Sequence, residues 1–133
     1  MPGARFARTA RMSKQIVLVG HCGIDGPRLQ EEIGAKISDA KVTRVNSDAD
    51  LKRACESPDA LLLVNRDPVG FDYDGLTIIR DICRGPTRAK VMLVSDYEDA
   101  QSEAQNLGAL PGFGKSEIGS DALVDRIKHA IDD

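Results

Sequence analysis

The sequence predicts an α/β protein with a doubly wound, five-stranded parallel sheet of order 2-1-3-4-5. Short, almost wholly apolar segments such as residues 60–64 are typical of strands that are buried on both faces. Segments with apolar residues at helical spacing follow these strands throughout the chain. This strict alternation favours parallel strands joined by right-handed helical crossovers.

The first half of the chain contains two strand–helix units and a third strand. We expect these strands at residues 16–19, 42–45 and 60–64, with the second at an edge of the sheet because its residues alternate in polarity. The first helix begins near Pro27, since proline is favoured in a first turn. Ser47 is expected to cap the second helix, with Asp50 three residues later.

The second half of the chain repeats the pattern. Strands are expected at residues 91–94 and, more weakly, 109–113. The predicted inward residues of the last three helices are Leu76, Ile79, Ile82 and Cys83; Ala100, Ala104 and Leu107; and Leu123, Ile127 and Ile131. On the same grounds we expect Cys55 and Cys83 to pack in the core.

Composition restricts the classes of protein that fit. The chain of 133 residues has 29% charged and 41% hydrophobic residues, which suits one globular domain. No apolar run approaches the roughly 20 residues that span a bilayer, and no apolar stretch follows the basic N-terminus, so we expect neither a membrane segment nor a secretory signal. Three cysteines without metal-type spacing favour a reducing, cytoplasmic location.

The charge is distributed unevenly along the chain. Residues 1–14 carry four basic residues and no acid, so the net charge of −3 for the whole chain leaves −7 on the remaining residues. An acidic body argues against a nucleic-acid-binding core. We therefore expect a flexible basic tail over residues 1–13 and one domain over residues 14–133.

The candidate functional residues follow the predicted strands. Ligands of doubly wound sheets bind beyond the carboxyl ends of the strands. The residues expected there are Gly20, His21 and Cys22; Asn65, Arg66 and Asp67; Ser95 and Asp96; and Lys115 and Ser116. For Ser95 the simpler alternative is a helix cap, and for Lys115 it is a solvated surface lysine.

The spacing of the second half resembles a known family. A strand that ends in Ser95, the segment 104–109 (Ala-Gln-Asn-Leu-Gly-Ala) and the segment 112–115 (Gly-Phe-Gly-Lys) are similar to the receiver domains of two-component response regulators. The Asp74-Gly75 pair is similar to the Asp-Gly pair of this family. The resemblance covers roughly residues 14–131 and implies the flavodoxin-like, receiver-like version of the predicted fold.

The resemblance also implies a chemistry that this sequence only partly retains. Receiver domains accept a phosphoryl group from a histidine kinase on an aspartate that ends the third strand, and two acids after the first strand help to hold Mg²⁺. A Ser or Thr and a Lys then hold the acyl phosphate. Ser95 and Lys115 are present, but Asn65 replaces the acceptor and Gly20-His21 replaces the acid pair. The sequence therefore predicts a degenerate pseudo-receiver without a metal or other cofactor.

Two alternatives remain open at the same loops. In one, Asp67 serves as a displaced phosphoryl acceptor, with Asp25 or Asp96 helping to bind a metal. In the other, Cys22-x5-Arg28 resembles the phosphate loop of cysteine-dependent tyrosine phosphatases, with Asp67 as the general acid. Pro27 removes one amide from such a loop, and a redox-active thiol is the related possibility.

The preferred interpretation is a non-enzymatic signalling domain in a two-component or phosphorelay-type pathway. It acts by phosphorylation-independent contact with protein partners. The resemblance implies a partner or homodimer surface within residues 98–128. No contact with nucleic acid or a membrane is expected.

Overall fold

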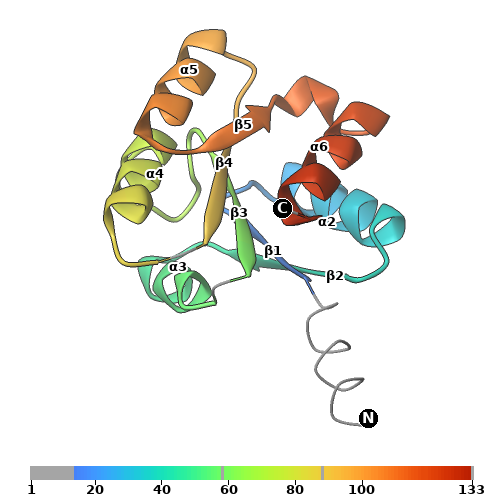
Figure 1. Ribbon diagram of the computed structural model, residues 1–133, viewed down its shortest axis with the longest axis horizontal. Helices are drawn as coiled ribbons and strands as arrows, with labels where there is room; N and C mark the ends of the chain where they lie inside the picture. Colours follow the sequence, from blue (N-terminus) through green and yellow to red (C-terminus); the bar gives the residue numbers. More distant parts are fainter. Residues whose placement is uncertain (1–13, 58, 88, 133) are drawn as a thin grey trace, which may run out of the picture.

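The computed structural model describes residues 14–57, 59–87 and 89–132, so the predicted tail over residues 1–13 lies outside the described residues. The elements in chain order are β1 (Lys14–Val19), α2 (Asp25–Lys36), β2 (Ala40–Val45), α3 (Asp48–Cys55), β3 (Ala60–Asn65), α4 (Gly75–Arg84), β4 (Lys90–Val94), α5 (Glu98–Leu107), β5 (Leu110–Phe113), the 3₁₀ helix η1 (Lys115–Glu117) and α6 (Asp121–Asp132). Strands and helices alternate as the sequence predicts (Figure 1).

The sheet has five parallel strands in the order β2-β1-β3-β4-β5, which confirms the predicted fold and places the second strand at an edge. The central strand β3 is buried along its whole length, because helices cover both faces of the sheet. Helices α3, α4 and α5 lie on one face, and α2 and α6 lie on the other (Figure 1). Each face has its own apolar core.

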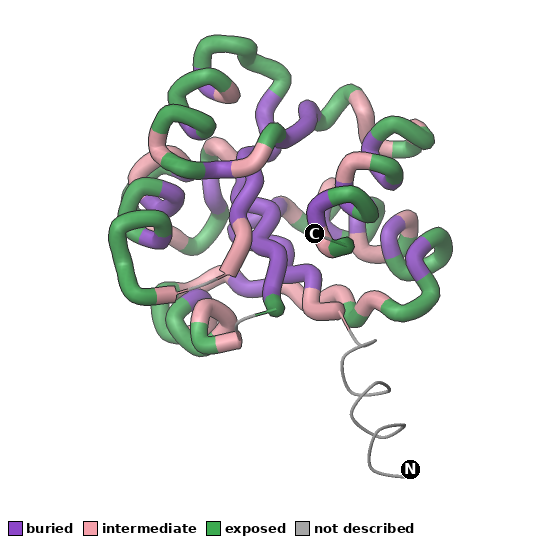
Figure 2. Tube along the Cα trace, viewed as in Figure 1, coloured by how far each residue is buried: buried purple, intermediate pink, exposed green. Residues whose placement is uncertain are grey.

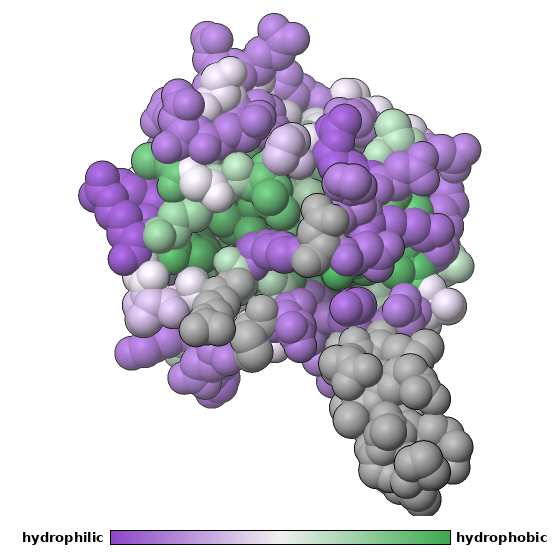
Figure 3. Space-filling view, viewed as in Figure 1, coloured by the Kyte–Doolittle hydropathy of each residue, from purple (hydrophilic) through white to green (hydrophobic). Residues whose placement is uncertain are grey.

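Burial follows this layered arrangement. The inner strands β1, β3 and β4 are largely buried, the edge strands β2 and β5 are less so, and the outer sides of the helices are exposed (Figure 2). Hydrophilic residues cover much of the face seen in Figure 3, and hydrophobic residues gather towards its middle. Among the described residues, no helix is long and apolar enough to cross a membrane.

Local signals in the sequence account for several helix boundaries. The side chain of Ser47 accepts a hydrogen bond from the N–H of Asp50, as predicted, and Asp74 caps α4 in the same way through the N–H of Thr77. The helix α5 ends at Leu107 and is capped by Gly108, whose φ of 118° lies in the left-handed region that glycine adopts freely.

One core prediction is wrong. Cys83 is exposed on α4, whereas Ile78, which the sequence reasoning did not assign to the core, is buried on the same helix. Cys55 is only half-buried, at the margin of the core on the α3–α5 face. A cysteine side chain is short and can lie at the edge of a helix's apolar face. Helical spacing alone therefore does not distinguish a buried position from one at that edge.

The last strand is irregular. The pairing of β4 with β5 shifts register between Met92 and Val94, which leaves Gly112 outside the regular ladder. Its N–H instead donates to the side-chain oxygen of Gln101 at 3.3 Å, and its carbonyl accepts a bond from Arg126. Side chains from α5 and α6 therefore satisfy the backbone of the bulged residue.

Candidate functional site

The candidate site lies at the carboxyl ends of the strands, where the loops after β1, β3, β4 and β5 meet. His21, Asn65 and Ser95 are the three polar residues that the structure buries in its described part. Buried polar groups need hydrogen-bond partners, so their partners indicate what each loop does.

Gly20 carries the first departure from the receiver pattern. Its φ is 73°, and a Cβ added there would lie 2.3 Å from Cβ of Pro68. Its carbonyl accepts a hydrogen bond from the N–H of Val69 at 2.8 Å. The loop after β3 therefore packs directly on the position where one acid of the pair is expected, and only glycine fits there.

His21 occupies the second position of the acid pair and is buried, with 1% of its surface exposed. Its Nε2 lies 2.8 Å from the carbonyl oxygen of Leu63, so Nε2 carries the hydrogen and donates it. Nδ1 is buried and has no hydrogen-bond partner among the described residues. Burial lowers the pKa of His21 to about 4, although the bond to Leu63 acts in the opposite direction. The position of the acid pair thus holds a neutral imidazole.

Asn65 ends β3, where the phosphoryl acceptor of a receiver is expected. Its Nδ2 donates to the carbonyl oxygens of Gly20 at 3.0 Å and Asp67 at 3.1 Å. These two bonds join the loops after β1 and β3. Its Oδ1 is buried and has no hydrogen-bond partner within the described part of the chain. The amide fits this position because it donates to two carbonyls, which an ionised carboxylate cannot do.

Ser95 and Lys115 keep the residue types of the family pattern but have other partners. The Ser95 hydroxyl oxygen accepts a bond from the N–H of Tyr97 at 3.1 Å, just before α5 begins. Lys115 lies 3.5 Å from the carboxylate of Asp25, with 43% of its side chain exposed. The serine therefore orders the turn into α5, and the lysine forms an ion pair across to α2.

The carboxylates proposed as metal ligands are engaged separately. Asp25 pairs with Lys115 and, at 3.7 Å, with Arg28. Asp96 accepts bonds from the N–H and hydroxyl of Ser116. Asp67 is 84% exposed and lies beside Arg66. Across the described residues, no group of three or more His, Cys, Asp or Glu side chains could hold a metal ion.

The Cys22-x5-Arg28 segment does not form an open loop. The helix α2 already begins at Asp25, and the N–H groups of Gly26 and Arg28 bond to the carbonyls of Cys22 and Ile24. The N–H of Asp25 points to the sulfur of Cys22 at 3.3 Å. Amides that are bonded within a helical turn cannot also cradle a phosphate. The amides of Gly26 and Arg28 are therefore not free to bind a phosphate, as the phosphate loop of this alternative would need.

Two residues that sequence reasoning did not assign, Arg44 and Tyr97, also contribute to the site. Arg44 of β2 donates to the carbonyl oxygens of His21 and Cys22, each at 3.3 Å. Its guanidinium covers Gly26, where an added Cβ would lie 2.6 Å from Cζ. Across the site, the guanidinium of Arg66 stacks 5.0 Å from the ring centre of Tyr97. For Arg44 the available sequence signals were an arginine within a strand and a glycine in the first turn of α2.

Comparisons with known proteins agree with the fold. No protein-family model and no curated protein sequence matches the chain. A solved signal receiver domain of a DNA-binding response regulator from Colwellia psychrerythraea 34H superposes with a TM-score of 0.72 at 20% identity, covering 90% of this chain and 99% of that one.

Two further structures are similar. A response regulator from Colwellia psychrerythraea gives a TM-score of 0.65 at 14% identity, covering 90% of this chain and 97% of that one. The Mn²⁺-bound form of response regulator Rcp1 gives 0.54 at 19% identity and covers 90% of each chain. The chain therefore has the fold of response-regulator receiver domains.

Proposed function

We propose that this protein is a cytoplasmic, non-enzymatic signalling domain of the pseudo-receiver type, which acts through protein contacts and not through its own phosphorylation. The receiver fold supports the signalling class. The altered loops after β1 and β3 support the absence of phosphoryl transfer.

The two hydrogen bonds that the Asn65 side chain donates are the main support for this proposal. The amide links Gly20 and Asp67 by these bonds, while Pro68 packs on Gly20. Phosphoryl transfer in receivers needs an acceptor carboxylate at this strand end and oxygen ligands for Mg²⁺ beside it. Here the first is an amide and the second is a glycine next to a buried, neutral imidazole.

The ion pair between Lys115 and Asp25 supports the same conclusion. In a receiver, the lysine after the fifth strand holds the acyl phosphate. In this chain the lysine already has a carboxylate at 3.5 Å, supplied by the start of α2. The loop after β5 therefore already has an anionic partner within the chain.

We place the partner or homodimer surface within residues 98–128, as the resemblance implies. The exposed side of α5 carries Glu98, Asp99 and Glu103, and Tyr97 beside it is 66% exposed. The backbone of Gly112 is already bonded to Gln101 and Arg126. We therefore expect contacts through side chains of α5 and α6 and not through strand addition at this residue.

Intact-mass analysis after treatment with acetyl phosphate and Mg²⁺ tests the proposal. We expect no phosphoryl adduct, whereas a receiver with its acceptor aspartate, treated in parallel, gains one. Sedimentation of the treated and untreated chain should be the same. An adduct that disappears in Asp67→Asn would overturn the proposal and make Asp67 the displaced acceptor.

A further inference from the structure

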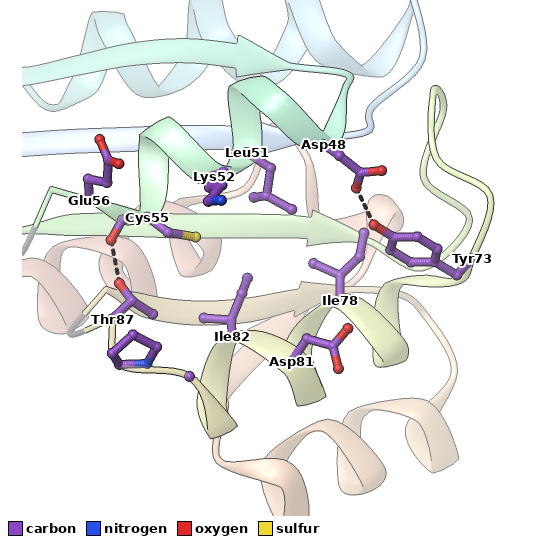
Figure 4. Close-up of a pocket in the computed structure, with 12 residues that line it drawn as sticks. Asp48, Leu51, Lys52, Cys55, Glu56, Tyr73, Ile78, Asp81, Ile82 and Thr87 are labelled. Atoms are coloured by element: carbon purple, nitrogen blue, oxygen red, sulfur yellow. Dashed lines mark hydrogen bonds between the residues drawn. The ribbon is translucent and has the colours of Figure 1, made fainter.

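A groove with a volume of about 690 Å³ runs between α3 and α4, outside the candidate site and outside residues 98–128. Figure 4 shows side chains from both helices and from the segments that flank α4 directed into it. Its lining includes Asp48, Leu51 and Cys55 of α3 and Ile78, Asp81 and Ile82 of α4.

The floor of the groove is apolar. Leu51, Ile78 and Ile82 belong to the core on this face of the sheet, and their side chains form the floor between the helices (Figure 4). Cys55 adds a half-buried thiol, and burial raises its pKa. The hydroxyl of Thr87 donates to the carbonyl of Cys55 and so joins the two walls at one end. The floor therefore suits aliphatic side chains.

The opposite end of the groove is acidic. The Tyr73 hydroxyl donates to the carboxylate of Asp48, as the dashed line in Figure 4 marks. This bond, together with partial desolvation and the charges of Asp48, Asp81 and Asp72, raises the pKa of Tyr73 to about 12. An aromatic ring surrounded by carboxylates is an environment that favours a cation.

Basic residues at the rim only partly offset this charge. Lys52 lines the groove, and Arg80 lies 3.3 Å from Asp81. The lining itself has three carboxylates, on Asp48, Glu56 and Asp81, against the single lysine. Asp48 and Asp81 lie towards the Tyr73 end (Figure 4), so a ligand that places a basic group there meets a negative excess.

The groove is open along its length, since most of its polar lining residues are exposed. Sites for small molecules typically enclose about 70–90% or more of the ligand surface, which an open groove does not. A trough between two helices with an apolar floor suits a peptide that presents one apolar face. The occupant that fits is therefore a segment of a protein.

We propose that the α3–α4 groove binds a basic amphipathic peptide segment of a partner protein. Aliphatic side chains of the segment pack on Leu51, Ile78 and Ile82, and an arginine or lysine lies beside Tyr73 and Asp81. This site is separate from the surface within residues 98–128, so either one can fail without the other.

Fluorescence anisotropy of the full chain with two labelled peptides tests the proposal. The probe is an amphipathic peptide of leucine and arginine, about 12 residues long, and the control peptide has glutamate in place of arginine. We expect saturable binding of the arginine peptide below about 1 mM and none of the glutamate peptide. Methyl resonances of Leu51, Ile78 and Ile82 should shift in NMR spectra as the peptide is added.

Charge-reversal variants show whether binding occurs in the groove. Glu56→Lys with Asp81→Lys should weaken binding about tenfold or more, since two rim charges change sign. The matched variant Glu31→Lys with Asp39→Lys makes the same charge change on exposed residues around α2 and should leave affinity unchanged. Equal losses in both variants, no binding, or shifts confined to residues 98–128 would each overturn the proposal.

Two other occupants are distinguished by the same measurements. Groove methyl shifts that depend on protein concentration without peptide would assign the groove to a second copy of the chain. Tighter peptide binding after Arg5→Ser, Arg8→Ser and Arg11→Ser would assign it to the chain's own basic segment. Either result would overturn the assignment to a partner protein.

Discussion

The two halves of the candidate site differ in how they depart from a phosphoryl-accepting receiver. On the β1–β3 side the residues themselves have changed: Asn65 donates to the carbonyl of Gly20, Pro68 packs on Gly20, and the buried His21 donates to the carbonyl of Leu63. On the β4–β5 side Ser95 and Lys115 are kept, but they bond to the turn before α5 and to Asp25. A residue type that is kept at a strand end can therefore have partners within the chain that the family pattern does not predict.

The largest expected effect comes from restoring an acid on the β1–β3 side. Gly20→Asp should destabilise the fold by about 4 kcal/mol, because it combines overpacking against Pro68 with a left-handed backbone. Chemical denaturation measures this change. Gly23→Asp is the matched control: an added Cβ there meets no atom within 4 Å, so stability should change by less than about 0.5 kcal/mol. Equal effects would show that the loop after β3 does not close on Gly20.

The buried imidazole makes the same side sensitive to acid. The pKa of His21 falls from 6.5 to about 4 on folding, so the unfolded chain binds the proton more readily. The stability from the neutral ring is present above pH 6.5 and is lost as the pH falls towards 4, by about 3 kcal/mol in all.

Denaturation between about pH 7 and pH 4 measures this loss. His21→Gln should remove this part of the pH dependence, while His129→Gln should retain it. If stability depends on pH in the same way in His21→Gln and in the wild type, folding does not lower the pKa of His21.

Replacing Asn65 with the aspartate of the receiver pattern tests the same side of the site. Asn65→Asp should destabilise the chain by about 2 kcal/mol at neutral pH, because a carboxylate would face the carbonyls of Gly20 and Asp67. Acidification should restore part of this loss, since a protonated carboxyl donates one bond. Asn106→Asp, at an exposed position on α5, is the control and should have little effect. A phosphoryl adduct on the introduced carboxylate of Asn65→Asp after acetyl phosphate treatment would show that the rest of the pocket is still competent.

The smallest effect is expected on the β4–β5 side. Lys115→Met removes an ion pair in which the lysine is 43% exposed, so stability should fall by less than about 0.5 kcal/mol. Thermal unfolding at low and high salt measures it, and the small difference should vanish in high salt. A loss as large as that of Asn65→Asp would mean that both sides are equally integral to the fold.

The fold could be predicted because each strand and helix has a local signal. Buried parallel strands consist of continuous apolar residues, as in residues 60–64. The start of α3 is marked by Ser47, whose side chain caps the helix. The alternation of elements and the handedness of crossovers indicated a doubly wound parallel sheet, and the order 2-1-3-4-5 is the version that the resemblance to receiver domains implies. Cys83 was misplaced because helical spacing does not resolve the border of an apolar face.

The candidate site was predicted only in part. The positions of Gly20, His21, Asn65, Ser95 and Lys115 at strand ends follow from topology. Their partners do not, because contacts such as Gly20 with Pro68 and Lys115 with Asp25 depend on how two loops distant in sequence pack together. The α3–α4 groove was missed for the same reason, since it lies between helices separated by a strand and a long loop.

The burial of β3 has a consequence for how the molecule opens. This strand pairs with β1 and β4 and contributes to both cores, so its amide hydrogens should exchange with solvent only through global unfolding. Asn65 is its last residue, and the amide that joins the two loops is therefore attached to the slowest-exchanging part of the chain. Local fluctuations should be confined to the loops above the sheet, which makes β3 amide exchange a direct readout of global stability in every variant described above.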